Sequence, residues 1–295
     1  MSEDVKKKVK DAIEKSGYPL ELYVSSILED KCVFSSNQYY FDHDENIART
    51  IDLYVWSLLD FRKPTIGISC SMIIECKKSE KNAWVFFETN SIAPSQTGQI
   101  IDHRQIATDD SEINIALLQF SPKLQEFFGG NVRSPISSIS RSYAVVKIGQ
   151  PISSDANSDT KDTIFEAMNQ TVKFIIYELE QRKHRIREIY RIGSIYQMTL
   201  IYFPVIVFDG HMFNAKLVNN KIELQEKNHV TVSYAYRTRD SKEPKNFYID
   251  VVKKEYFEQF LQQKIKLCDE IRQASMNVSD KLEKDAASLK LQPDS

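Results

Sequence analysis

A carboxylate and an ammonium group stand two residues apart in a segment that otherwise reads as a buried β-strand. In the segment 66–78, the even-numbered residues up to Cys76 are all apolar, whereas Glu75 and Lys77 are odd-numbered. Successive strand side chains point to opposite faces, so Glu75 and Lys77 are predicted to project the same way, about 7 Å apart. One interpretation is a solvated strand end that carries an ordinary ion pair. The other is a functional site.

Asp52 lies in the preceding apolar segment, 49–57, where the low strand propensity of aspartate makes it unexpected. The polar residues of 58–65 predict a loop that joins the two strands as an antiparallel hairpin centred near Arg62. In that register, Asp52 lies one diagonal step from Glu75. Two carboxylates and a lysine are therefore expected to meet at one end of a two-stranded ribbon.

This order of residues resembles the PD-(D/E)xK nuclease superfamily. The similarity rests on Asp52, then a hairpin, then Glu75-Cys76-Lys77 after an apolar strand. Glu21, in an earlier helix, matches an acidic residue of the family's first core helix, whereas Ile51 stands where the family name has proline. The similarity covers about residues 18–78. It implies a restriction-endonuclease-like α/β fold, with a central mixed β-sheet flanked by helices, and hydrolysis of phosphodiester bonds.

The residue types agree with a magnesium or manganese site. Asp52 and Glu75 offer hard carboxylate oxygens, the donors that suit Mg²⁺ or Mn²⁺. A carboxylate-held ion can bind a scissile phosphate and orient a water. Lys77 would position or deprotonate that water, or stabilise charge that develops on phosphorus. The resemblance adds the backbone carbonyl of Cys76 as a ligand. Glu21 is either a further metal ligand or water holder, or a solvated acid favoured by the helix dipole.

Basic residues are candidate contacts for the nucleic acid that the resemblance implies, DNA more than RNA. These residues are Lys78, Lys81, Arg182, Lys183 and Arg185. The last three fall at the end of a predicted helix, where a solvated end that complements the helix dipole is the preferred interpretation and a DNA-binding arm is the alternative. The implied function is a metal-dependent endonuclease of prokaryotic restriction or defence type.

Two other classes of function remain open. The first is a catalytically inactive nucleic-acid-binding or assembly module that keeps the nuclease fold. The second is a regulatory protein whose C-terminal helix binds a partner, or a second copy in a homodimer. The presence of Asp52, Glu75 and Lys77 in one chain favours an enzyme over the inactive module. Self-association measured with and without the residues after Lys253 would test the second class.

The composition fits one large domain. The chain has 295 residues, a net charge of −2 and 42% hydrophobic residues, which is ordinary for a globular protein. The expected organisation is a nuclease domain at 1–253, with an insert at about 89–130, and then a helix and tail at 254–295. The start is charged, no apolar run is long enough to span a bilayer, and the four cysteines lack metal-ligand spacing. These features predict a cytoplasmic protein with reduced thiols and no membrane partner.

Hydrophobic periodicity predicts the remaining elements. Helices are expected at 3–15, 19–30 and 163–189, with one or two helices at 113–128 and one or two at 256–289. Strands are expected at 32–41, 83–88, 143–148, 198–208, 211–218, 221–225, 230–237 and 246–252. Turns are expected at 79–82 and at Asp209-Gly210. Pro204 predicts that the strand 198–208 lies near a sheet edge or begins after a bend. The last helix is expected to pack against the sheet, with a dimer seam as the alternative.

Overall fold

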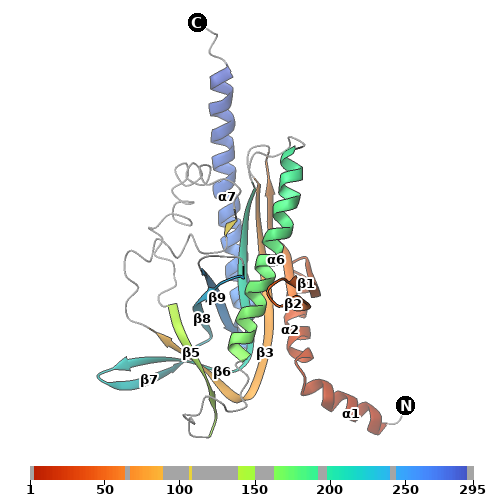
Figure 1. Ribbon diagram of the computed structural model, residues 1–295, viewed down its shortest axis with the longest axis vertical. Helices are drawn as coiled ribbons and strands as arrows, with labels where there is room; N and C mark the ends of the chain where they lie inside the picture. Colours follow the sequence, from red (N-terminus) through yellow and green to blue (C-terminus); the bar gives the residue numbers. More distant parts are fainter. Residues whose placement is uncertain are drawn as a thin grey trace.

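The computed structural model describes residues 3–63, 67–88, 106–107, 139–149, 163–191, 198–239 and 244–290. The elements are, in chain order, α1 Glu3–Glu14, α2 Tyr18–Glu29, β1 Phe34–Asp42, β2 Ile47–Arg62, β3 Gly67–Glu88, β4 Ile106–Ala107, β5 Ile139–Lys147, α6 Thr163–Arg191, β6 Met198–Val218, β7 Lys221–Glu226, β8 His229–Tyr236, β9 Lys245–Lys253, the 3-10 helix η1 Lys254–Tyr256 and α7 Phe257–Lys290 (Figure 1).

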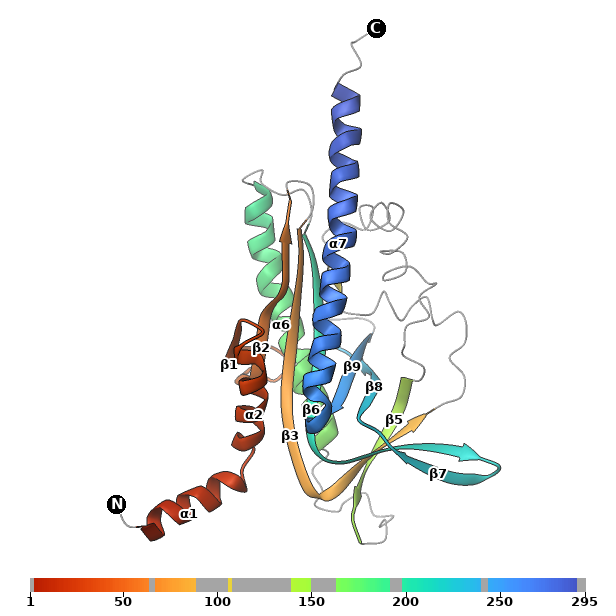
Figure 2. The same cartoon turned by 180° about the vertical axis from the view of Figure 1, so that it is seen from behind.

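A mixed β-sheet forms the middle layer, with helices on both of its faces (Figures 1 and 2). In the described part of the chain it has nine strands, in the order β1-β2-β3-β5-β8-β9-β6-β4, with β7 paired to β6. Helix α6 covers one face, and α2 and the first half of α7 cover the other. The predicted α/β fold, a mixed sheet flanked by helices with a helix at the C-terminal end, is therefore confirmed. The predicted insert at 89–130 lies outside the described residues, except for β4.

Each face of the sheet has its own hydrophobic core. The core beneath α2 and α7 receives alternate residues of β3, namely Ile68, Cys70, Met72, Ile74 and Cys76. This confirms the buried face that the alternation predicts. The core beneath α6 contains aromatic side chains, with Trp84 of β3 stacked on Phe208 of β6 at 3.9 Å between ring centroids. Strand β6 contributes to both cores, which explains its nearly continuous apolar sequence.

The long strands β3 and β6 bend together instead of reversing. The turns predicted at 79–82 and at Asp209-Gly210 are wrong, because both segments lie inside continuous strands that pair in parallel from Gly67↔Met198 to Phe87↔Ala215. The register shifts between Ser79 and Ala83, opposite Gly210 and His211. A bulge of this kind increases the local twist and bends the strand that carries it. The turn-forming residues therefore produce a bend.

Pro204 lies inside a central strand, so the predicted edge position is wrong. It stands opposite Ile73 of β3 in the parallel ladder. On the other side of β6, pairing with β4 involves Leu200 and Ile201, and pairing with β9 begins at Val205. Proline lacks a backbone N–H and cannot donate to a ladder. Its position between two pairing partners on that side avoids the loss of a hydrogen bond.

Gly210 allows β3 and β6 to approach at the bend, and its replacement by alanine should destabilise the protein. An added Cβ would lie 2.5 Å from the Phe208 ring and 2.6 Å from the Ser79 carbonyl oxygen. We expect Gly210→Ala to lower the free energy of unfolding by about 2 to 3 kcal/mol, because the backbone must shift. Chemical denaturation measures the change. Gly17→Ala is the matched control, since its Cβ would meet only the Glu21 carboxylate, at 3.7 Å; equal effects of the two substitutions would contradict the argument.

Five strands are joined in a closed circuit of ladders. The second half of β3 pairs with β5, β5 with β8, β8 with β9, β9 with β6, and β6 again with β3. The hairpin β1–β2 lies outside this ring and is attached through β2 to the first half of β3. The sheet therefore contains a ring of five strands, a β1–β2 hairpin that extends from β3, and the strands β4 and β7, which are both paired to β6.

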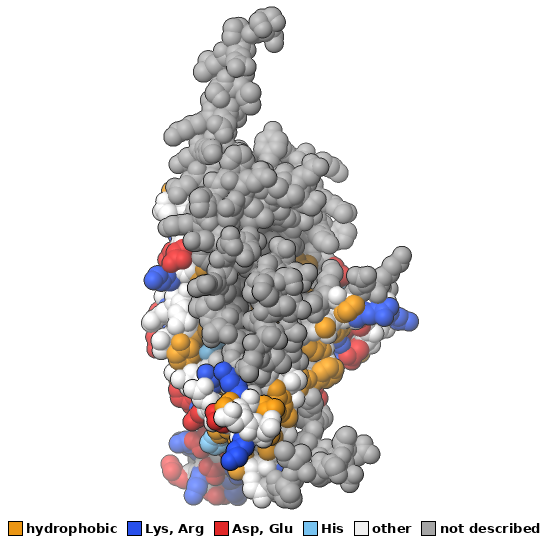
Figure 3. Space-filling view, turned by 90° about the vertical axis from the view of Figure 1, so that its left-hand side faces the viewer, with side chains coloured by type: hydrophobic (Ala, Val, Ile, Leu, Met, Phe, Trp, Pro, Cys, Tyr) orange, Lys and Arg blue, Asp and Glu red, His pale blue; other side chains and the backbone are white. Residues whose placement is uncertain are grey.

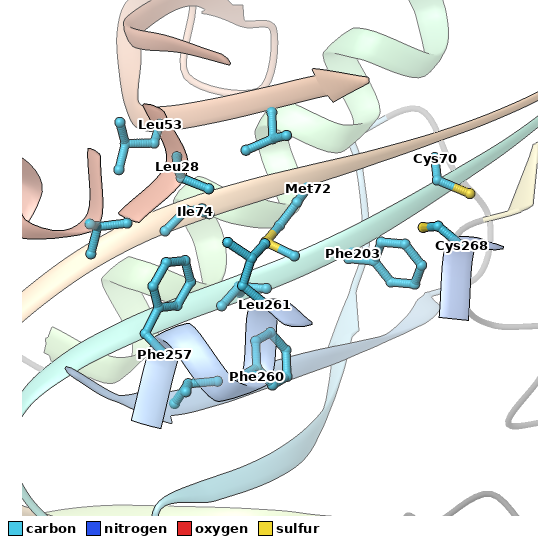
Figure 4. Close-up of a cluster of buried hydrophobic side chains, with 14 of the residues drawn as sticks. Leu28, Leu53, Cys70, Met72, Ile74, Phe203, Phe257, Phe260, Leu261 and Cys268 are labelled. Atoms are coloured by element: carbon cyan, nitrogen blue, oxygen red, sulfur yellow. The ribbon is translucent and has the colours of Figure 1, made fainter. Parts of the chain in front are cut away.

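The first turns of α7 fix this helix to the sheet, as predicted. Phe257, Phe260 and Leu261 are buried in the core beneath the helix (Figure 4). The helix then continues past the sheet (Figure 2). Its side chains after residue 276 lie outside the described part, so a homodimer through this helix remains a prediction.

A buried ionic network also holds α7. Asp250 of β9 lies 2.8 Å from Lys264 Nζ of α7 and 2.9 Å from His229 Nε2, and it accepts a hydrogen bond of 2.8 Å from the Thr231 hydroxyl. Burial alone would raise the pKa of Asp250, but the charges of Lys264 and His229 outweigh burial and hold that pKa well below its ordinary value. Among the described residues, the partners of this carboxylate belong to α7 and β8. The network therefore holds α7 against the sheet.

Candidate active site

The β2–β3 ladder ends next to Asp52 and Glu75, two of the predicted site residues. The ladder has a bulge between Val55 and Leu59 and ends at Leu53↔Ile74. The next residues along the two strands are Asp52 and Glu75, which therefore follow directly at the end of the ladder. The register predicted from a hairpin centred near Arg62 is wrong, because β2 continues through 58–62 and the bulge absorbs extra residues.

Asp52 bridges the opening between the strands. Its Oδ2 accepts a hydrogen bond of 2.7 Å from the backbone N–H of Cys76. On its other side, β1 pairs Ser36 with Leu53 and Gln38 with Ile51, and the intervening Asn37 has a positive φ of 51°. Asparagine tolerates this left-handed conformation better than most residues. The backbone around Asp52 is thus irregular toward both neighbouring strands.

Glu75 and Lys77 form the expected ion pair, but in a buried environment. Lys77 Nζ donates to Glu75 Oε1 at 2.6 Å and to Gln170 Oε1 at 3.3 Å. Glu75 is only 2% exposed, so the interpretation as a solvated strand end is wrong. Within the described part of the chain, the second oxygen, Oε2, has no hydrogen-bond partner. A buried carboxylate oxygen without a partner carries a substantial desolvation cost.

The pKa values of Asp52 and Glu75 are both raised in the folded protein. Burial raises the pKa of Glu75 to about 8, and the nearby charge of Asp52 adds to this effect while Lys77 opposes it. Burial also raises the pKa of Asp52, against the Cys76 N–H and the Lys77 charge. For Lys77, burial would lower the pKa, but Glu75 and Asp52 outweigh it, so the pKa lies above its ordinary value. Without a bound cation, burial therefore disfavours the ionised forms of Asp52 and Glu75.

Glu21 lies near the other site residues, on the first turn of α2. Burial raises its pKa, followed by the charge of Asp52, while Lys77 lowers it. Its carboxylate lies 3.7 Å from the position that a Cβ of Gly17 would occupy, at the start of the helix. Glu21 thus interacts with the site electrostatically and also occupies the helix-dipole position that the alternative interpretation predicts.

Asp52 and Glu75 provide carboxylate oxygens for a divalent ion, although no group of three possible ligands lies together among the described residues. Among the residues that the structure describes, no group of three or more His, Cys, Asp and Glu side chains is close enough to hold a metal. Asp52 and Glu75 nonetheless lie close enough to interact electrostatically, and the Oε2 of Glu75, which has no partner among the described residues, is the kind of hard oxygen that Mg²⁺ or Mn²⁺ binds. The residues present therefore fit such an ion, and the ligand set with Glu21 and the Cys76 carbonyl stays a prediction.

The candidate nucleic-acid contacts have varied surroundings. Lys78 Nζ donates a hydrogen bond of 3.2 Å to the Glu14 carbonyl and therefore caps the C-terminal end of α1. It also pairs with Glu80 at 3.0 Å. Lys81 is exposed at the bulge of β3. The side chains of Arg182, Lys183 and Arg185, in the last turns of α6, lie outside the described part. On the face that Figure 3 shows, the described basic and acidic side chains are intermixed.

Sequence reasoning missed Gln170, the residue of α6 that contacts Lys77. Ala167, Thr171 and Phe174 of the same helix are fully buried, and Gln170 falls at the same helical spacing. Its backbone carbonyl also accepts a hydrogen bond of 3.5 Å from the Tyr40 hydroxyl. A polar residue on the buried side of an amphipathic helix was the available signal.

No protein-family model, curated protein or solved structure matches this chain. No helix in the described ranges combines the length and apolar character needed to cross a membrane. The side chains of the site are therefore the basis for any assignment of function.

Proposed function

We propose that the protein is a cytoplasmic nuclease that uses Mg²⁺ or Mn²⁺ to hydrolyse phosphodiester bonds in DNA, of the prokaryotic restriction or defence type. The observation that carries the proposal is the Glu75 carboxylate, which is buried, has an oxygen without a partner among the described residues, accepts a hydrogen bond from Lys77 and interacts electrostatically with Asp52. Packing alone gives no reason to bury such a group. The resemblance to the PD-(D/E)xK superfamily supports the same assignment.

In this proposal, Asp52 and Glu75 hold the ion, with the Cys76 carbonyl as a backbone ligand and Glu21 as a further ligand or a water holder. A bound ion would polarise the phosphate and make a water more acidic. Lys77 serves chiefly to stabilise negative charge on the phosphate, because its raised pKa keeps it protonated. Gln170 and Glu75 hold Lys77 Nζ in place. Phosphate contacts by Lys78, Lys81, Arg182, Lys183 and Arg185 remain part of the proposal.

The test is a substrate panel with a separate measurement of metal binding. The full chain is incubated with plasmid DNA, single-stranded DNA and RNA in the presence of Mg²⁺, Mn²⁺ or EDTA, and Mn²⁺ binding is followed by calorimetry. We expect cleavage of DNA that EDTA abolishes, and binding of Mn²⁺ that Asp52→Asn weakens by about tenfold or more. Failure of every substrate together with absence of Mn²⁺ binding would refute the proposal.

A second candidate is an inactive nucleic-acid-binding or assembly module with the same fold. It is favoured by the direct contact of Lys77 with Glu75 and by the lack of a three-ligand group among the described side chains. This candidate predicts that the protein binds DNA in EDTA and that added Mg²⁺ leaves the DNA intact. The residues after 276 offer a test of the remaining class, a regulatory protein whose C-terminal helix binds a partner, because their removal spares the buried turns of α7 while removing its projecting part.

Gln170 should act as a positioning residue for Lys77. We expect Gln170→Leu to lower kcat by about 5- to 20-fold with little change in KM, because one hydrogen bond that orients the lysine is lost. Gln170→Glu should restore part of kcat, since its carboxylate can still accept from Lys77 Nζ. Steady-state kinetics on the cleaved substrate measure both. Gln181→Leu, at an exposed position of α6, is the control, and an unchanged kcat in Gln170→Leu would exclude the role.

A further inference from the structure

All four cysteines belong to or border one hydrophobic core, the one beneath α2 and α7, where Cys268 interacts electrostatically with two others, Cys32 and Cys70. Cys70 of β3 and Cys268 of α7 are 0% and 1% exposed. Figure 4 shows the two side chains next to each other, and the neighbouring Cys268 thiol raises the pKa of Cys70. Cys32, in the segment after α2, is partly exposed, packs against the same core and is close enough to Cys268 to influence it electrostatically.

The arrangement joins parts of the chain that are far apart in sequence. Cys70 belongs to the central strand that carries Glu75 and Lys77, and Cys268 belongs to the helix that continues past the sheet. A disulfide requires Cα atoms within about 7 Å and side chains that face each other. Cys70 and Cys268 are neighbouring side chains on two packed elements, so we expect the bond to form with little backbone movement.

We propose that these thiols are a peroxide-sensitive site, in which Cys32 is oxidised first and a disulfide between Cys70 and Cys268 is the final product. The proposal does not depend on the nuclease assignment. The oxidant is hydrogen peroxide or another small hydroperoxide. Cys32 is the point of first attack because it is the only partly exposed thiol of the three.

The steps balance with one peroxide for one disulfide. The Cys32 thiolate attacks a peroxide oxygen, which breaks the O–O bond and gives a sulfenic acid and one water. Cys268 then attacks the Cys32 sulfur and displaces a second water. Finally, Cys70 attacks the Cys268 sulfur, and Cys32 leaves as a thiol. Two thiols lose two electrons and two protons in total, and the peroxide takes them up to give two waters.

The surroundings of the thiols set the speed of this chemistry. Burial raises the pKa of the Cys32 thiol, the neighbouring Cys268 raises it further, and Lys31 opposes both. Because the thiolate is the reactive form, oxidation should be slow at neutral pH and faster at higher pH. In a reducing compartment the thiols are the resting state, so the disulfide would form only during oxidation.

The test uses the intact chain. The protein is treated with hydrogen peroxide, its remaining thiols are alkylated, and mass spectrometry is used to search the digest for linked peptides. We expect the Cys32–Cys268 link early and the Cys70–Cys268 link later. The oxidised protein should unfold at a temperature about 5 °C or more above that of the reduced protein, because the final bond closes a long loop. Absence of the Cys70–Cys268 link would overturn the proposal.

Variants separate the steps. Cys70→Ser should stop the reaction at the Cys32–Cys268 link, and Cys32→Ser should slow the final link by at least about tenfold. Cys76→Ser is the control, because Cys76 lies outside the three-thiol cluster and should leave both links unchanged. A final link that forms equally fast in Cys32→Ser would overturn the role of Cys32, and a final link that joins Cys70 to a cysteine other than Cys268 would overturn the pairing.

Discussion

Asp52→Asn should reduce metal-dependent DNA cleavage by about 10³-fold or more while the protein stays folded. Asparagine keeps an oxygen that can accept the N–H of Cys76, now 2.7 Å from Asp52 Oδ2, so the link between β2 and β3 survives. It removes the negative charge that a divalent ion needs. Initial rates of plasmid cleavage at saturating Mg²⁺ measure the loss, and circular dichroism checks the fold.

The matched control for this substitution lies on the same strand. Asp60 is exposed and pairs with Arg62 at 2.9 Å, far from the opening between β2 and β3. Asp60→Asn should therefore cleave DNA at the normal rate. Lys77→Ala should also abolish cleavage, because it removes the cation that would face the phosphate. Undiminished cleavage by Asp52→Asn or Lys77→Ala would count decisively against the nuclease assignment.

The metal-free protein should lose stability as the pH rises from about 5 to 8, and Glu75→Gln should remove most of this loss. The pKa of Glu75 rises from an ordinary 4.5 to about 8 on folding. Between these values the folded state holds a proton that the unfolded state has released, so stability falls as the pH increases. The full shift corresponds to a loss on the order of 2 to 5 kcal/mol. Glutamine is neutral throughout, so the variant should be more stable than the natural protein at pH 8 to 9.

Urea denaturation in EDTA at several pH values between 5 and 9 measures this effect. Part of the slope should remain in Glu75→Gln, because the pKa values of Asp52 and Glu21 are raised as well. Glu80→Gln is the control, since Glu80 is fully exposed and its pKa is lowered by Lys78. Mg²⁺ should stabilise the natural protein more as the pH rises, because the ion holds the ionised carboxylates. An identical slope in Glu75→Gln and the natural protein would show that Glu75 is not the titrating group.

Alternation and periodicity were sufficient to predict most elements and the shared face of Glu75 and Lys77. The strand face from Ile68 to Cys76 is buried as predicted, and α1 and α2 end within a residue of their expected positions. These features depend on local side-chain patterns, which a sequence displays directly.

The errors arise where a distant part of the chain decides the outcome. Asp209-Gly210 has the residue types of a turn, yet the neighbouring β3 makes this position a bend within β6. The register between β2 and β3 at Asp52 depends on a bulge between Val55 and Leu59, which the local sequence pattern does not predict. Gln170 reaches Lys77 only because α6 crosses the sheet at that point, 93 residues later in the chain. Contacts of this range are invisible to local periodicity.

The ring of five strands limits which parts of the candidate site can move. Glu75 and Lys77 sit on β3 beside β6, inside the closed circuit, where no strand can swing out without breaking ladders on both sides. Asp52 belongs to the β1–β2 hairpin and Glu21 to α2, both outside that circuit. Any hinge that draws the carboxylates together around an ion must therefore lie in the hairpin and α2, which would close onto a stationary half formed by β3.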